Sequence, residues 1–144
     1  MTAPGGPGVT DLVELLASLD PQLDDTAYVV IIGPHGLDPT ALAPLATVIE
    51  DEGTTVVVPA QHLAEALALG CTPEDPPPMA RITLRVHSSL LAVGLTAAVS
   101  GALAAEGISC NVLAGYHHDH LLVPAERADD SLAVLRRLQA DARP

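Results

Sequence analysis

The side chains best suited to chemistry lie in one short segment, Tyr116-His117-His118-Asp119-His120. On an extended backbone His118 and His120 point to one side and Asp119 to the other, and two imidazoles on one side could ligate a metal ion. A zinc site needs a third ligand, and His87 could supply it if the fold brings it near. The same segment is typical of a solvated hairpin turn. We favour the turn and assign no metal ligand.

Two adjacent serines, Ser88 and Ser89, are candidate nucleophiles if a histidine acts as their base. No GxSxG sequence surrounds them, and a serine ahead of a helix more often caps it, so we expect no catalytic residue. Cys71 and Cys110 lack the CxxC spacing of a redox or zinc site. Two such isolated thiols favour a reducing compartment, the cytoplasm, and nothing in these patterns calls for a cofactor.

The elements that would position these residues can be predicted from the chain's periodicity and its Gly and Pro residues. The strand at 81–87 alternates, with Ile82, Leu84 and Val86 facing one side and Arg81, Thr83, Arg85 and His87 the other. In the second half we then expect a helix beginning between 90 and 95 and ended by Gly107, a hairpin over 108–123, and a helix over 126–140. In the first half we expect a helix capped by Thr10 and ended by Pro21, a strand over 27–32, a Pro-rich loop over 33–44 with at most one helical turn, a hairpin over 46–58, and a helix over 60–69.

The two halves contain an internal repeat. Val56-Val57-Val58-Pro59-Ala60 matches Leu121-Leu122-Val123-Pro124-Ala125 at an offset of 65 residues, and 67–69 falls on 132–134. The segment between the halves, residues 71–78, contains four prolines. This composition predicts a stiff connector. We therefore expect two domains, 1–78 with an additional N-terminal helix and 79–144. Each half would run strand, helix or loop, strand, strand, helix.

Charge is distributed unevenly along the chain, whose formal net charge is −12. Residues 1–80 contain twelve acids and no Lys or Arg, whereas residues 81–144 contain six acids and six Arg. Such an acidic half repels phosphate backbones and anionic lipids, which argues against nucleic-acid or membrane partners. No segment reads as a leader, and the apolar run at 90–105 is too short to span a bilayer. We expect Arg81 and Arg85 to contact first-half acids; the alternative is that one of them holds a ligand carboxylate.

The second half resembles a known family in two stretches, Gly94-Leu95-Thr96 and Glu106-Gly107-Ile108-Ser109-Cys110-Asn111-Val112. Together with the element order, they resemble the ACT domain, a βαββαβ ferredoxin-like module. The resemblance is closest to small bacterial proteins with two ACT-like units, which are similar to the ACT units of CASTOR-type amino-acid sensors. It implies an α+β fold of two ferredoxin-like units, with antiparallel sheets and helices on one face.

The resemblance also implies a function, namely binding of a small molecule, expected to be an amino acid, by a regulatory protein that is not an enzyme. The expected ligand-binding residues are His87, Ser88, Ser89, Gly94 and Asn111. Only six strands are available where two complete modules would use eight, which leaves sheet edges open. We therefore expect the two halves to join edge to edge or face to face and the protein to be a homodimer. The alternatives are a metal-dependent enzyme using His118, Asp119 and His120, and a dimerisation module without a ligand.

Overall fold

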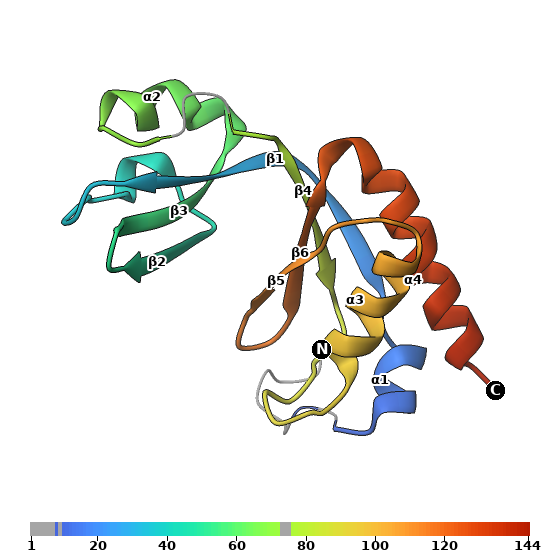
Figure 1. The fold of residues 1–144 in the computed structure, drawn as a ribbon. Coiled ribbons are helices and arrows are strands. Elements are labelled where there is room, and N and C mark those ends of the chain that lie inside the picture. Colours follow the sequence, from blue (N-terminus) through green and yellow to red (C-terminus); the bar gives the residue numbers. More distant parts are fainter. Residues whose placement is uncertain (1–7, 9, 73–75) are drawn as a thin grey trace. The chain divides into compact units, whose positions relative to one another are not determined.

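The computed structural model describes residues 8, 10–72 and 76–144, in two compact units. Unit 1 is built from residues up to Asp24 and from Arg81 onward, and unit 2 from Asp25–Ala80. The elements are α1 Leu12–Ala17, β1 Pro21–Gly33, the 3-10 turn η1 Thr40–Leu42, β2 Ala46–Glu50, β3 Gly53–Pro59, η2 Ala60–His62, α2 Leu63–Ala68, β4 Met79–Leu84, α3 Leu95–Ala105, β5 Asn111–Ala114, β6 Asp119–Pro124, η3 Ala125–Arg127 and α4 Ala128–Ala142 (Figure 1).

Unit 2 is a small antiparallel sheet with short helical segments. The later residues of β1 pair with β3, with Tyr28 opposite Pro59 and Gly33 opposite Thr54, and β3 pairs on its other side with β2. Alternate residues of β1 and β3 face a common core with η1 and α2. Its buried members are Val29, Ile31, Leu42, Val56, Val58, Ala66 and Cys71. The single turn η1 confirms the prediction of a loop with at most one helical turn.

Unit 1 has the strand order β1-β4-β6-β5, and α3 and α4 cover one face of these strands (Figure 1). Strand side chains Leu84 and Leu121 meet Leu95 and Val99 of α3 on this face. Helix α1 packs on α3 and α4. The side chain of Gln139 on α4 fixes the end of α1, because its amide donates to the Ala17 carbonyl at 3.0 Å.

Strand β1 fills one of the sheet edges that the sequence left open. The sequence predicts a first helix that ends at Pro21 and a strand that begins at residue 27, whereas β1 already starts at Pro21. Proline is tolerated as the first residue of a strand, and the polar residues after it hid the pattern. Pro21–Asp24 belong to unit 1, where β1 lies next to β4. The strand that the second half lacks after α4 is therefore supplied from the beginning of the chain.

The internal repeat is confirmed by backbone geometry. Pro59 has φ −54° and ψ 135°, and Pro124 has φ −53° and ψ 132°. Each proline is followed by a single 3-10 turn and then by a helix. The same strand, proline and helix unit therefore folds the same way in both halves.

Other predictions hold apart from element ends. The first helix begins at Leu12 rather than after Thr10, because the Asp11 carboxylate accepts a hydrogen bond from the Glu14 N–H at 2.9 Å and forms the N-cap. The alternation of β4 is confirmed, with Ala80, Ile82 and Leu84 buried. Two predictions extend over residues outside the described ones, namely the N-terminal segment without a leader and part of the 71–78 connector. In the described part of the chain, no helix has the length and apolar character needed to cross a bilayer.

Candidate functional site

The loop from β4 to α3 is shaped by a glycine. Gly94 immediately precedes α3 with φ +100°, a conformation that side chains rarely adopt, and its carbonyl accepts a hydrogen bond from the Ala98 N–H at 2.9 Å. Among the described residues, no side chain caps this end of α3. The first N–H groups of the helix, where its positive dipole end lies, therefore have no side-chain acceptor at the cap position.

A small cavity lies beside this helix end, wholly within unit 1. Its volume is about 110 Å³. It is bounded by the β4–α3 loop, the first turn of α3 and the adjoining ends of β5 and β6. The residues that line it are Ser88, Ser89, Leu90, Ala92, Leu95, Thr96, Ala114 and Asp119. Because drug-sized ligands need sites of roughly 300–1,000 Å³, this cavity suits only a small molecule.

Asp119 provides the acidic group of this cavity. The Ser88 hydroxyl donates to Asp119 Oδ2 at 3.4 Å, a long hydrogen bond that ties the loop to β6. Ser89 holds the loop itself, since its Oγ accepts from the Leu91 N–H at 3.1 Å and its carbonyl accepts from Ala92 at 3.0 Å. A carboxylate and a helix N-terminus at one cavity can bind the ammonium and the carboxylate of one zwitterion.

The structure brings together some of the predicted ligand-binding residues. Ser88 and Ser89 line the cavity, and Gly94 sets the start of α3 without lining it. His87 instead stacks edge-to-face on His117, with 5.1 Å between ring centroids. Asn111 is exposed at the first position of β5, about 10 Å along the strand from the cavity residue Ala114.

Asp119 and Thr96 also line the cavity, although neither is among the ligand-binding residues expected from the sequence. A signal for Asp119 was present, because strict alternation in the strand places it on the same face as Leu121 and opposite His120. That face carries the helices. A polar residue at the end of the strand face that the helices cover is a stronger candidate for ligand binding than the residues beside it on the turn.

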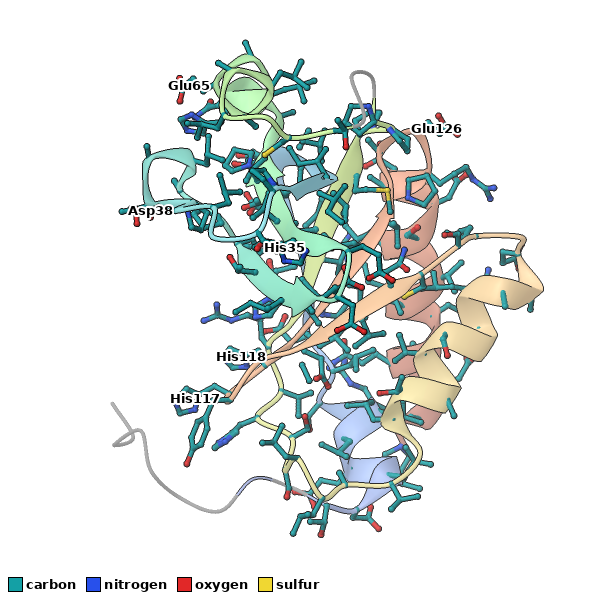
Figure 2. All side chains as sticks on the ribbon, turned by 60° about the vertical axis from the view of Figure 1, so that its left-hand side comes forward. His35, Asp38, Glu65, His117, His118 and Glu126 are labelled. Carbon is teal, nitrogen blue, oxygen red and sulfur yellow. The ribbon has the colours of Figure 1, made fainter. Side chains whose placement is uncertain are left out.

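The histidines on and beside the β5–β6 turn contact other parts of unit 1. Figure 2 shows His117 and His118 at the tip of the hairpin, on the side away from α3. His118 Nδ1 lies 3.4 Å from the Val86 carbonyl oxygen, and His120 Nδ1 lies 3.0 Å from Thr83 Oγ1. Over the residues that the structure describes, no three His, Cys, Asp or Glu side chains are placed to hold a metal ion.

The surroundings of His120 affect its protonation. Burial lowers the pKa of His120, and the nearby Arg81 and His118 lower it further. Arg81 is itself paired with Asp24, with Nη2 at 2.6 Å and Nε at 3.0 Å from the same Asp24 oxygen, and both side chains are about three-quarters buried. The expected contact between Arg81 and a first-half acid is thus confirmed, whereas Arg85 is exposed.

A second hollow in unit 1 is larger, about 280 Å³, and lies between Ile108 and α4. Its charged groups bind one another. Arg127 is paired with Asp130 at 2.9 Å and Arg137 with Glu106 at 3.3 Å. Since each guanidinium has a carboxylate partner, this hollow is the weaker candidate for a charged ligand.

Comparisons with known proteins agree with the strand order and the repeat. Two family models described as ACT domain match residues 7–74 and 80–137. A solved protein of unknown function from Vibrio cholerae, described as a possible transport protein, is 41% identical, with a TM-score of 0.77 over 89% of this chain and 95% of that one. No curated protein matches.

Two more distant structures share the fold. The regulatory subunit of aspartate kinase from Thermus flavus is 16% identical, with a TM-score of 0.60 over 82% of this chain and 95% of that one. E. coli aspartokinase III in complex with aspartate and ADP is 14% identical, with a TM-score of 0.59 over 82% of this chain and 32% of that one.

Proposed function

Because this chain belongs to the ACT-domain family and contains two such domains in tandem, we propose that it is a regulatory protein that binds an amino acid in the Ser88–Asp119 cavity. The proposed domains along the sequence are 1–78 and 79–144, and the compact unit built from the second also includes Pro21–Asp24 of the first. The protein would bind its ligand without transforming it. Binding would favour one conformation of the chain, which a partner protein then recognises.

One observation carries this proposal: Asp119 and the first turn of α3, which has no side-chain cap, line the same cavity of about 110 Å³. The Asp119 carboxylate would accept the ligand ammonium, and the first N–H groups of α3 would donate to the ligand carboxylate. Ser88 would lose its long bond to Asp119 and donate to the ligand instead. The small volume favours a small polar side chain over an aromatic one.

The other predicted contacts remain part of the proposal. Gly94 acts through the position of the first turn of α3, and Ser89 through the shape of the loop. His87 and Asn111 lie outside the cavity lining, so contact with the ligand would need the loop or the strand to shift.

We also propose a homodimer. The β4–α3 loop exposes Leu90, Leu91 and Val93, with 66%, 86% and 84% of their surface accessible, at the rim of the cavity. A second copy covering this loop would bury apolar surface and close the cavity. A monomer by light scattering at micromolar concentration would contradict this part of the proposal. Both cysteines are free thiols, which supports the cytoplasm as the proposed compartment.

The test is a thermal-shift screen of the twenty amino acids, followed by calorimetry. A ligand at 100 times its Kd should stabilise the protein by about 2.7 kcal/mol. Asp119→Asn should abolish the shift, because the ammonium loses its counter-charge. The matched control, Asp130→Asn, changes an acid on the exposed face of α4 and should leave binding intact.

If no amino acid binds the wild-type protein, the proposal fails and the dimerisation module without a ligand becomes the better account. If Asp119→Asn still binds the amino acid, the proposed regulatory function stands but the binding site lies elsewhere.

A further inference from the structure

The outer edge of unit 2 carries a strand with one unused side. Strand β2 lies at one end of the strand order, and in the described part of the chain it pairs only with β3. In an antiparallel pair, alternate residues direct their N–H and C=O groups away from the partner strand. The outer side of β2 therefore offers a row of donors and acceptors to an added strand.

The side chains of β2 protect this edge only at its end, where Glu50 is the one charged residue of the strand. Val48 is 48% exposed and Ile49 85% exposed, and as consecutive residues they point to opposite faces of the strand. Protected edges usually carry a Lys, a Pro or an inward-pointing charge, whereas Ala46–Ile49 has none of these. On the other outermost strand, β5, Val112 and Leu113 are only partly exposed. An apolar edge open on both faces indicates a binding surface.

The charge around this edge selects the kind of partner. Unit 2 contains eight acids and no Lys or Arg. Three of these acids, Glu50, Asp51 and Glu52, are exposed at the turn where β2 ends. The Glu50 carboxylate accepts a hydrogen bond from the Thr55 hydroxyl, which keeps it beside the strands. Two copies meeting at β2 would bring two wholly acidic units together, and like-charge contact opposes that association.

We propose that β2 is a docking edge for an extended basic segment of another protein. The segment adds a strand antiparallel to β2, with its Lys or Arg residues beside the acidic turn and apolar residues packing on Val48 and Ile49. This inference concerns unit 2 and is independent of the proposed amino-acid site in unit 1.

The probe is a fluorescein-labelled peptide, Lys-Lys-Val-Thr-Val-Thr-Val, titrated in an anisotropy assay. Antiparallel pairing places its two lysines beside Glu50–Glu52. We expect saturable binding that weakens as salt is added, because the charges are exposed. The peptide with Glu-Glu in place of Lys-Lys should not bind. If the basic peptide fails to bind, the proposal is overturned.

Backbone pairing is tested separately from charge. Two versions of the peptide are N-methylated at alternate positions, one at odd and one at even residues. In strand addition only one set of N–H groups faces β2, so one version should lose binding and the other keep it. If both versions bind equally well, binding is by charge alone and the proposal fails.

The protein variants complete the test. Ile49→Lys should weaken binding about tenfold or more, which corresponds to about 1.4 kcal/mol. The control Val13→Lys adds the same charge at a residue 63% exposed on α1 and should have little effect. Unchanged binding by Ile49→Lys overturns the proposal. So does a dimer in sedimentation velocity that Ile49→Lys dissociates, since the edge would then belong to a second copy.

Discussion

Replacing a glycine of α3 by alanine should change the stability in opposite directions at two positions, one just before the helix and one inside it. Gly94 precedes the helix with φ +100°, and a Cβ there would lie 3.1 Å from Leu12 Cδ2. A left-handed conformation costs a non-glycine residue about 1–2 kcal/mol, and the flexible Leu12 methyl can move aside. Gly101 lies inside α3, and a Cβ there meets nothing within 4 Å. Alanine exceeds glycine in helix propensity by about 0.8–1.0 kcal/mol.

We therefore expect Gly94→Ala to lower the free energy of unfolding by about 1–2 kcal/mol and Gly101→Ala to raise it by about 0.8–1.0 kcal/mol. The two variants should differ by about 2–3 kcal/mol, although each adds the same methyl group near the same helix. The assay is urea denaturation followed by circular dichroism at the helical band, because the chain contains no Trp. If Gly94→Ala is as stable as the wild type, the backbone assigned to the loop is wrong.

Three further changes test the core and charges of unit 1. The pKa of His120 in the folded protein lies below 6.5, so as the pH falls the unfolded chain takes up a proton first. The free energy of unfolding should therefore fall as the pH drops below 6.5. In His120→Gln, the melting temperature should depend less on pH in that range. A double-mutant cycle of Asp24→Asn and Arg81→Met should give a coupling free energy of about 1–2 kcal/mol, which lies between the coupling energies of exposed and of buried ion pairs. A coupling energy near zero would contradict the ion pair. Leu103→Ala, at a residue with 0% exposure, should cost about 2–5 kcal/mol in urea denaturation, and a smaller loss would mean the core tolerates a cavity there.

Much of the fold could be predicted because its local signals agree with its tertiary packing. The repeat around Pro59 and Pro124 is one such signal, since proline fixes φ and both sites need the same turn from strand to helix. Strand β4 is another, because one buried face imposes a period of two on its sequence. In both cases, the residues that determine the structure lie next to each other in the chain.

The first part of β1 could not be predicted in this way. Pro21–Asp24 is a strand because it lies beside β4, about 60 residues later in the chain, and its own residues are poor strand formers. The site shows the same limit. Ser88 and Gly94 belong to a recognisable loop, whereas Asp119 lines the candidate cavity only because the hairpin brings it to the start of α3.

The division of β1 between the units has a consequence for biosynthesis. Unit 2 is one continuous stretch, Asp25–Ala80, and all of it is synthesised before α4. Unit 1 needs Pro21–Asp24 from near the start of the chain as well as α4 from its end. Domains fold as units during synthesis, so the acidic unit can fold first while the first strand of its neighbour waits unpaired. A fragment beginning at residue 79 would lack that strand and should fold poorly when produced alone.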